Sequence, residues 1–338
     1  MNSAIIGRAF ISGGAGFIGS HIADRLAQAD ANVTIYDNFS TGQESFIKHH
    51  VGNPRIRVVR ADVLDRERLN KEMADCDIVF HLQANADVRG GISATRVDLE
   101  QNTIATWNIL EAMRLNKIRR IVFASSATVY GEPDVFPTPE SYASIQTSLY
   151  GASKLACEAM IQAYSEYFGI TCYIFRFVSW IGERYTHGVI FDFVEKLKAD
   201  AQALDVLGDG KQRKSYLDVT DGVNGIFYAL QRSRERKNVF NLGHDEFMNV
   251  LDLADIVVAE LGLKNVRYRT TGGERGWLGD SPFVHLDTGK LKALGWRPWI
   301  SIEQGIRNTV RYLRAHPEIL EKSSLAPTGS FRALGGRA

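Results

Sequence analysis

A glycine-rich turn near the N-terminus constrains the fold of this chain more than any other feature. The apolar run 8–12 ends in Gly13-Gly14-Ala15-Gly16-Phe17-Ile18-Gly19, and a helical pattern follows. The spacing G-x-x-G-x-x-G lets the backbone approach a pyrophosphate and directs the next helix N-terminus at its charge. We therefore predict a strand, a turn and a helix that bind a dinucleotide, and we assign these residues to it: Gly13, Gly16, Phe17, Ile18 and Gly19.

A carboxylate stands at the end of the second predicted strand. The strand covers 32–36 and is followed by Asp37 and Asn38, with Asp37 about 20 residues past the glycines, where dinucleotide-binding folds place an acidic residue. A carboxylate there accepts hydrogen bonds from the adenosine ribose and repels a 2′-phosphate. We expect Asp37 and Asn38 to bind NAD in preference to NADP; the structural alternative for Asp37 is an ordinary strand-end turn.

The alternation of strand and helix patterns continues to residue 176. Further strands are expected at 56–61, 77–82, 119–125 and 170–176, and helices at 64–74, 93–116 and 144–168. Such alternation predicts an α/β fold, a doubly wound parallel Rossmann sheet with right-handed crossovers. Ligands of such sheets bind at the carboxyl ends of the strands. The residues assigned to the cofactor there are Asp62, Val63, Leu82, Gln83, Ala84 and Ser125.

The second half of the chain has a looser pattern of shorter elements. We predict that 1–176 is a Rossmann NAD-binding domain, to which some later segments return, and that 177–316 is a smaller α/β substrate lobe over the strand ends. The segment 317–338 is rich in Ser, Gly and Arg, which predicts a mobile tail.

Composition limits the classes of partner. The 338 residues carry a net charge of +1, so we expect neither a nucleic acid nor a membrane surface as partner. The three cysteines are scattered without a metal-binding spacing, which indicates a reducing compartment. No apolar run is long enough to span a bilayer, and a soluble cytoplasmic protein is expected.

A tyrosine and a lysine lie four residues apart in the segment predicted to be the helix 144–168. Tyr150 and Lys154 would share one helix face, and a nearby ammonium favours the phenolate. Lowering the Tyr150 pKa from its usual ~10 by roughly 3 units requires about 4 kcal/mol, more than one lysine readily supplies, so we expect the positive nicotinamide ring of bound NAD⁺ to act together with Lys154. Ser126 follows the fifth strand and would hydrogen-bond a substrate oxygen. We predict Ser126, Tyr150 and Lys154 as catalytic residues, with Tyr150 and Lys154 also at the cofactor. A solvated helix face and a strand-end cap are the structural alternatives; Glu158 would hold Lys154 or cover the helix surface.

Taken together, these motifs resemble the extended short-chain dehydrogenase/reductases, within the NAD-dependent nucleotide-sugar epimerase/dehydratase group. The resemblance implies tightly held NAD, a C-terminal lobe for a nucleotide-sugar substrate, and a homodimer formed through the helices near 93–116 and 145–168. It also implies that Asn102 lies near the cofactor. The motifs that carry it are the glycine turn, Asp37, Asp62-Val63, His81-Leu82, Ser125-Ser126-Ala127-Thr128-Val129-Tyr130-Gly131 and the Tyr150–Lys154 pair.

The dipeptide Ala127-Thr128 separates the branches of this group. Sugar dehydratases carry an Asp-Glu pair at these places, and the related decarboxylases keep a Glu where Thr128 stands. Neither side chain present here transfers protons readily. The segment is similar to that of the UDP-glucose 4-epimerases, which implies transient oxidation at C4 of a UDP-hexose with Tyr150 as base. The alternatives are a 4-ketoreductase or dehydrogenase and, less favoured, a dehydratase or a non-catalytic NAD-binding regulator.

The resemblance also implies residues that bind the substrate. Lys214 occupies the usual place of a phosphate-binding Arg, and its neighbour Arg213 is a second candidate; an exposed loop cation is the alternative for both. Arg275 is a further phosphate candidate in a loop that departs from the relatives' pattern. Ser179 stands where many relatives have Asn. The full predicted substrate set is Ser126, Thr128, Ser179, Arg213, Lys214 and Arg275.

Overall fold

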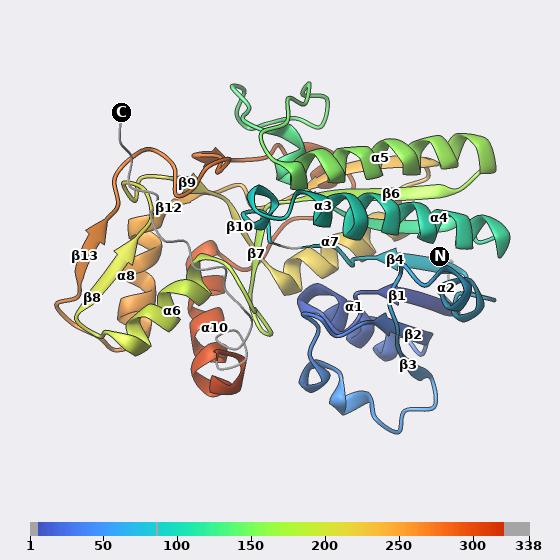
Figure 1. Ribbon diagram of the computed structural model, residues 1–338, viewed down its shortest axis with the longest axis horizontal. Helices are drawn as coiled ribbons and strands as arrows, with labels where there is room; N and C mark the ends of the chain where they lie inside the picture. The colour runs from blue at the N-terminus through green and yellow to red at the C-terminus, as the bar shows by residue number, and fades with distance from the viewer. Residues whose placement is uncertain (1–5, 86, 321–338) are drawn as a thin grey trace.

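Seven parallel strands form one central sheet in the computed structural model, which describes residues 6–85 and 87–320 (Figure 1). The strand order is β11-β6-β5-β4-β1-β2-β3. The strands are β1 (Arg8–Ser12), β2 (Asn32–Asp37), β3 (Ile56–Arg60), β4 (Ile78–His81), β5 (Arg120–Ser126), β6 (Thr171–Phe177) and β11 (Lys237–Leu242). The order reverses direction between β1 and β4, so the predicted doubly wound α/β sheet is confirmed.

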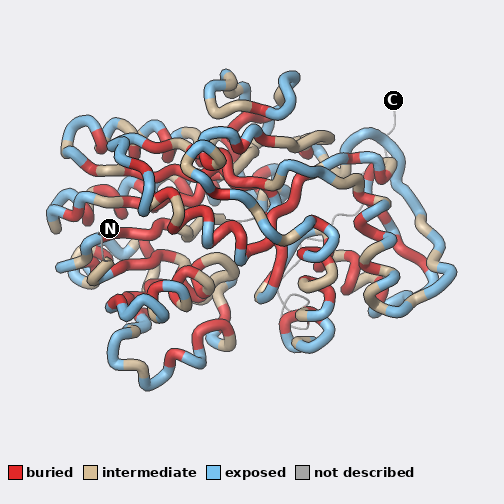
Figure 2. The backbone as a smooth tube through the Cα atoms, turned by 180° about the vertical axis from the view of Figure 1, so that it is seen from behind, coloured by how far each residue is buried: buried red, intermediate tan, exposed pale blue. Residues whose placement is uncertain are grey.

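The central strands are buried on both faces, because helices cover both sides of the sheet. All four residues of β4 are buried, as are six of the seven in β6, and Figure 2 shows buried backbone running through the strands. This explains why the strands read as continuous apolar runs. In the register, Ser12 pairs with both Tyr36 and His81, so the carboxyl ends of β1, β2 and β4 meet at one edge.

Two helical layers enclose the sheet. One face packs against α1 (Phe17–Gln28) and α7 (Val219–Arg232), and the other against α2 (Arg66–Glu72), α4 (Ala105–Leu115) and α5 (Leu149–Phe168). Side chains alternate between the layers: Ile11 belongs to the first core and its neighbour Phe10 to the second.

The predicted helix 93–116 is interrupted. It consists of α3 (Thr95–Asp98), the π-helical segment Leu99–Ile104 and α4. The predicted helix 144–168 begins only at Leu149, because the Ser148 side chain accepts a hydrogen bond from the Gly151 N–H and so caps the first turn. Tyr150 therefore lies in the first turn of α5.

A smaller α/β lobe lies at one end of the sheet (Figure 1). Its helices α6, α8 and α10 pack on one another, and its strands form short groups, β7 with β10, β8 with β13, and β9 between β12 and β14. The bounds are β7 (Ser179–Ile181), α6 (Val189–Ala199), β8 (Ala203–Val206), β9 (Arg213–Lys214), β10 (Tyr216–Asp218), β12 (Met248–Asn249), α8 (Val250–Glu260), β13 (Arg267–Thr270), β14 (Phe283–Val284), α9 (Gly289–Ala293) and α10 (Ile302–Ala315).

Segments from the second half of the chain complete the first half. Strand β11 pairs in parallel with β6, and α7 packs beside α1. Residues 317–320, the start of the expected mobile tail, are helical, with Ile319 and Leu320 buried; the rest of that segment lies outside the described residues. Within the described part of the chain, no helix combines the length and apolarity needed to cross a membrane.

Candidate functional site

The glycine turn brings bare backbone to the edge of the sheet. Gly13 has a φ of 73°, and a Cβ on Gly19 would lie 2.1 Å from the Gly13 carbonyl oxygen. Only glycine fits these two positions. Gly16 is the N-cap of α1 and provides no side chain to bond the first-turn N–H groups. Phe17 and Ile18 thus begin a helix whose N-terminus can face an anion.

A narrow cleft opens beside this turn. It is lined by Gly13, Tyr36, Asp37, Asn38, Ala61, Val63 and Gln83. The buried Asp37 carboxylate accepts hydrogen bonds from the Ala15 N–H at 2.9 Å and the Phe39 N–H at 2.8 Å. Burial raises the pKa of Asp37, and these two bonds oppose the rise. Each carboxylate oxygen keeps a free lone pair for a ribose hydroxyl.

These features fit NAD. The glycine turn would hold the pyrophosphate, and Asp37 would hold the adenosine ribose hydroxyls. Asn38 donates a hydrogen bond to the Asp62 carboxylate at 2.8 Å, and Asn108 donates to the Val63 carbonyl at 3.1 Å. The predicted residues Asp37, Asn38, Asp62 and Val63 are therefore brought together on one side of the cleft.

The residues after β4 line the next part of the edge. The Leu82 and Gln83 N–H groups both donate to the Ser12 carbonyl, at 3.1 and 3.0 Å, and Ala84 follows them. The Gln83 side chain donates to the Gln101 carbonyl at 2.9 Å. Its other amide atom, Oε1, is buried and has no partner within the described residues, which leaves an acceptor available to a ligand.

Asn102 is buried within the π-helical segment. Its amide donates to the Asp98 carboxylate at 3.1 Å and to the Ser153 hydroxyl at 2.8 Å. Ser153 in turn donates to the Tyr150 carbonyl at 2.7 Å. Asn102 thus links α5 to the loop after β4, whose Asn85 N–H donates to the Asn102 side chain. A π-helical turn at this position is typical of functional sites.

Ser125 and Glu158 have a structural role that the sequence did not indicate. The Ser125 hydroxyl donates to Glu158 at 2.5 Å, and Arg176 forms a bidentate pair with the same buried carboxylate. The expectation that Glu158 covers the helix surface is wrong, because Glu158 is 1% exposed. Its negative charge does raise the pKa of the buried Lys154, although its hydrogen bonds are with Ser125 and Arg176. Burying this carboxylate requires Arg176 as partner.

The predicted catalytic residues meet at the carboxyl end of β5. Lys154 is buried, and its ammonium donates to the Ala124 carbonyl at 2.8 Å and lies 5.8 Å from the centre of the Tyr150 ring. The Ser126 hydroxyl accepts a hydrogen bond from the Thr128 N–H at 3.2 Å and is close enough to Tyr150 to influence its pKa. The structure thus brings Ser126, at the end of β5, to Tyr150 and Lys154 on α5.

The expected lowering of the Tyr150 pKa by Lys154 and NAD⁺ together stays a prediction, and Lys154 alone does not produce it in the protein without cofactor. Burial raises the pKa of Tyr150, the negative charge of Asp98 raises it further, and the Ser126 hydroxyl opposes the rise. Burial also lowers the pKa of Lys154 to about 8. The same low-polarity surroundings disfavour both the phenolate and the ammonium, which helix spacing alone could not indicate.

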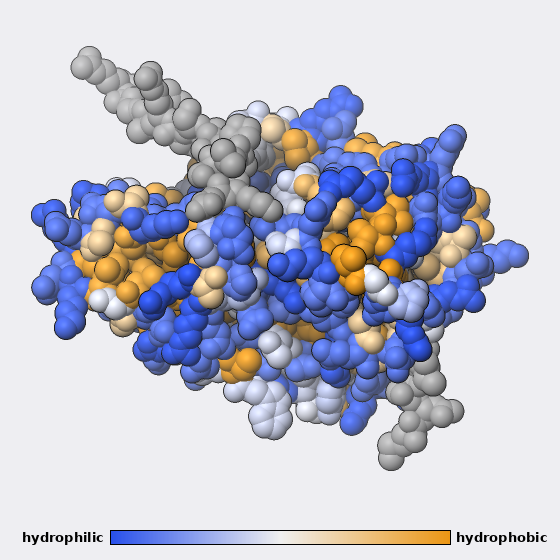
Figure 3. All heavy atoms as spheres, turned by 90° about the horizontal axis from the view of Figure 1, so that it is seen from below, coloured by the Kyte–Doolittle hydropathy of each residue, from blue (hydrophilic) through white to orange (hydrophobic). Residues whose placement is uncertain are grey.

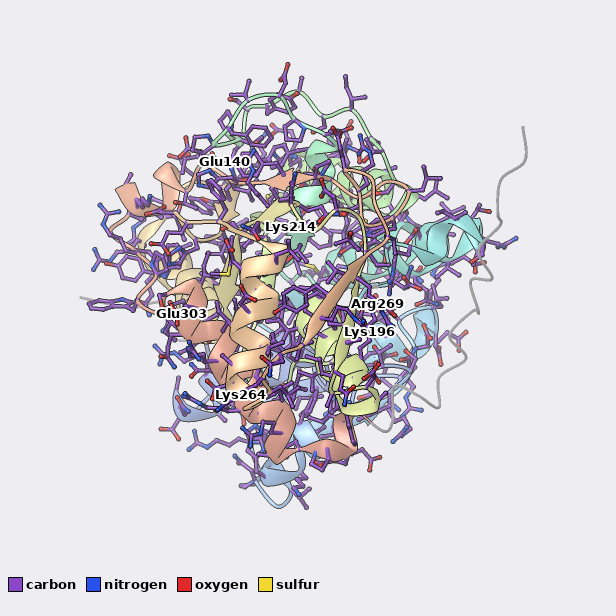
Figure 4. The ribbon with its side chains drawn as sticks, turned by 90° about the vertical axis from the view of Figure 1, so that its left-hand side faces the viewer. Glu140, Lys196, Lys214, Lys264, Arg269 and Glu303 are labelled. Carbon is purple, nitrogen blue, oxygen red and sulfur yellow. The ribbon has the colours of Figure 1, made fainter. Side chains whose placement is uncertain are left out.

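The two adjacent basic residues of β9 point in opposite directions, because side chains alternate along a strand. Lys214 forms an ion pair with the buried Asp280. Arg213 instead lies over the ring of Phe283, with its guanidinium carbon 4.1 Å from the ring centre, and is exposed. Figure 4 shows Lys214 at the N-terminal end of α8, with Lys264 beyond the other end of that helix.

Arg275 joins Lys214 through Asp280. Its guanidinium donates to the Asp280 carbonyl at 2.8 Å and pairs with Glu132 at 2.6 Å. The structure therefore groups Lys214 and Arg275 and separates Arg213 from them.

Two further predicted substrate residues lie apart from this pair. Thr128, next to Ser126, has a buried hydroxyl without a partner in the described part of the chain. Ser179 is exposed at the first position of β7.

Sequence reasoning missed two carboxylates, Asp98 beside Tyr150 and Asp280 beside Lys214. The only sequence signal for Asp98 is its position four residues before Asn102, which places both on one helical face.

Comparison with known proteins gives consistent matches over most of the chain. Residues 9–243 match the model of the NAD dependent epimerase/dehydratase family. A crystal structure of UDP-galactose 4-epimerase is 36% identical, with a TM-score of 0.83 over 91% of this chain and 99% of that chain. UDP-glucuronic acid decarboxylase 1 of Xenopus tropicalis is 30% identical over 92% of this chain and 73% of its own length.

A dehydratase has the same fold. The dTDP-glucose 4,6-dehydratase of Streptomyces venezuelae, solved with NAD bound, is 26% identical, with a TM-score of 0.84 over 92% of this chain and 98% of that chain. The similar proteins thus carry out three different reactions on nucleotide sugars.

Proposed function

The chain belongs to the NAD-dependent epimerase/dehydratase family, and we propose that it is a nucleotide-sugar 4-epimerase acting on a UDP-hexose. One observation carries this proposal. Tyr150 and Ser126 lie close together, and the residues that follow Ser126, Ala127 and Thr128, carry neither an acidic nor a basic side chain. Tyr150 is the residue there that can exchange a proton with a sugar hydroxyl. A reaction that removes a hydride and returns it needs one such group.

The chain's own residues have distinct roles in this reaction. When bound, NAD supplies the hydride acceptor and donor and a positive charge that favours the Tyr150 phenolate. Ser126 orients the 4-hydroxyl, Tyr150 takes its proton, and after the sugar has turned its other face Tyr150 returns the proton. Lys154, with a pKa of about 8, is mostly protonated at neutral pH and so favours the phenolate as it forms.

The residues at 127 and 128 disfavour the other reactions of the family. Dehydration requires an acid and a base beside the sugar in addition to the tyrosine, and alanine and threonine supply neither. The buried Thr128 hydroxyl has no partner within the described residues, so it can hydrogen-bond a sugar hydroxyl but has no neighbour to activate it. We therefore assign Thr128 to substrate binding.

A panel of nucleotide sugars tests this function. Purified protein is incubated with UDP-glucose, UDP-galactose, their N-acetyl forms and UDP-glucuronate, and the anomeric and H4 signals are followed by proton NMR. Epimerisation approaches the same mixture from either epimer. The proposal fails if every substrate is unchanged, or if the products have lost water or carbon dioxide.

A net oxidoreductase, the 4-ketoreductase or dehydrogenase, is distinguished by its cofactor. An epimerase regenerates NAD in each cycle and has no need to release it, whereas a dehydrogenase must exchange it. We expect NAD to be released only when the purified protein is denatured, as detected by chromatography of the supernatant. Stoichiometric consumption of added NAD during turnover would favour the dehydrogenase.

We also propose the arrangement of the whole protein. The segment 177–316, apart from α7 and β11, would bind the nucleotide sugar over the strand ends, and two chains would associate through α4 and α5. Exposed apolar side chains along these helices and along the π-helical segment before α4 support a dimer: Leu99, Ile104, Trp107, Leu115, Leu149 and Tyr167. The three unpaired cysteines favour the cytoplasm. Light scattering after gel filtration would detect the dimer.

A further inference from the structure

Two adjacent histidines converge on one carboxylate outside the nucleotide-sugar site. His49 and His50 lie in the 3₁₀ turn Lys48–His50, and Asp24 lies on α1. The Nε2 atoms of the two histidines are 2.7 and 2.8 Å from the same oxygen, Oδ1 of Asp24. These three ligand atoms all lie within 4.8 Å of one another. Two imidazoles and a carboxylate form a donor set that suits zinc.

Arg184 holds the carboxylate from its other side. The guanidinium is 2.7 Å from Oδ2 of Asp24, which leaves Oδ1 directed at the histidines. Partners that fix a ligand in this way are typical of metal sites.

The site has space for further ligands. Asp24, His49, His50 and Arg184 line an open hollow of ≈ 480 Å³, which leaves room for water to complete the coordination. Figure 3 shows the largely hydrophilic face of the molecule seen from below in Figure 1, where the segment after β2 projects.

We propose that Asp24, His49 and His50 bind a zinc ion that ties the turn 48–50 to α1. Zinc bonds of about 2.0–2.2 Å in a tetrahedral arrangement separate the ligand atoms by roughly 3.3 Å. Both nitrogen–oxygen distances must therefore widen by roughly half an ångström. Rotation of the 46% exposed His49 permits this for one distance, and a small shift of the 21% exposed Asp24 carboxylate permits it for the other. The positive charge of Arg184 weakens the attraction for a cation, so we expect micromolar rather than nanomolar affinity.

The site joins three segments that are distant in sequence. Asp24 follows the glycine turn on α1, the histidines belong to the connection between β2 and β3, and Arg184 belongs to the loop after β7. A metal that binds only the folded arrangement stabilises it by mass action. Zinc should therefore raise the melting temperature of the protein by a few degrees, without any nucleotide sugar present.

Zinc titration of the full, untagged chain after treatment with a chelator tests the proposal. Calorimetry with zinc chloride should give one zinc per chain, and His49→Ala and His50→Ala should each weaken binding at least tenfold. His285→Ala is the matched control, because that histidine lies in the C-terminal lobe and bonds the Asp245 carbonyl; its zinc binding should equal that of the wild type. Replacing zinc with cobalt should give visible absorption bands that both variants lose.

Two outcomes would overturn the site. One is the absence of saturable zinc uptake by the wild type, and the other is unchanged uptake in His49→Ala and His50→Ala. If His50→Ala does not fold, His49→Ala decides alone, because that side chain is half exposed and its loss leaves the core intact. None of these measurements uses the sugar reaction, so their result is independent of the proposed epimerase activity.

Discussion

The sheet half and the C-terminal lobe position charged groups in different ways. In the sheet half, the groups that we propose face the cofactor are backbone N–H groups and side chains at strand ends, such as Asp37 and Ser126, held by long strands. In the lobe, the strand that carries Lys214 has two residues. The two side chains grouped there as phosphate candidates are already in ion pairs, Lys214 with Asp280 and Arg275 with Glu132.

This difference separates two kinds of binding. The cofactor edge is organised before a ligand arrives, so its binding costs little rearrangement. A diphosphate entering the lobe must share or displace the carboxylate partners of the two cations. We therefore expect substitutions in the sheet half to affect chemistry and cofactor retention, and substitutions in the lobe to affect substrate affinity.

The largest expected effect is on the sheet half. Tyr150→Phe removes the proton-transfer group and should lower kcat by about 10³-fold, within the range of general acid–base catalysis. NAD retention should not change, because we propose that the cofactor is held mainly by the glycine turn and Asp37. The measurement is NMR-detected turnover with cofactor content.

Tyr167→Phe is the matched control, since Tyr167 lies on the same helix and is 79% exposed. Full activity of Tyr150→Phe, or an equal loss in both variants, would contradict the assignment of the base.

A smaller effect is expected in the lobe. Lys214→Met removes the charge that we propose pairs with the diphosphate, and hydrogen bonds to charged groups contribute about 1.5–3 kcal/mol. We expect kcat/KM to fall about 10- to 100-fold, mainly through KM, with NAD content unchanged. Lys264→Met, beyond the far end of α8 (Figure 4), should be neutral.

If Lys214→Met changed kcat and left KM unaltered, the contrast between the two regions would be lost. Melting temperatures of both variants show whether the unpaired Asp280 carboxylate has unfolded the lobe instead.

The next prediction concerns pH. Asp98 raises the pKa of Tyr150 and also that of Lys154. Asp98→Asn removes this charge, so both pKa values should fall, and both limbs of the pH profile of kcat/KM should move to lower pH by less than about one unit. The alkaline limb in the wild type should reflect Lys154, whose protonated form is lost as pH rises through about 8.

The exposed Glu100, which pairs with Arg96, provides the control substitution Glu100→Gln, with no displacement of either limb. A purely structural role for Asp98 would lower the height of the profile and leave its limbs in place.

The smallest expected effect on kcat/KM distinguishes the two arginines of the lobe that are candidates for phosphate binding, Arg275 and Arg213. Arg275 contacts Asp280 beside Lys214, so Arg275→Ala should lower kcat/KM a few-fold, as expected for a half-exposed charge. Arg213 lies on the opposite side of β9 against Phe283, so Arg213→Ala should change it less than about twofold. Steady-state kinetics of both variants provide the measurement. A larger loss of kcat/KM in Arg213→Ala than in Arg275→Ala would reverse the assignment of Arg275 as the phosphate-binding arginine.

Much of the cofactor half could be predicted because its signals are local. The glycine spacing, the residue after β2 and the alternating strand and helix patterns depend on neighbours within a few residues or on burial of whole strands. From these signals the sequence predicted the family, the doubly wound fold and NAD as cofactor. The family match and the strand order confirmed these predictions. The lobe gave a weaker pattern, since its strands of two to four residues are too short for periodicity to show.

The sequence by itself determined the alternation of strands and helices with polar residues at the strand ends. It also determined the turn that only glycine can form and the four-residue spacing of Tyr150 and Lys154. The tertiary structure decided how these groups are charged and what they face. It placed the half-buried Tyr150 and the buried Lys154 in low-polarity surroundings and so moved their pKa values toward the neutral forms. It also separated Arg213 from Lys214, and brought His49 and His50 to Asp24. The physical reason is range: backbone geometry acts between neighbours, whereas desolvation and charge pairing depend on segments that only folding brings together.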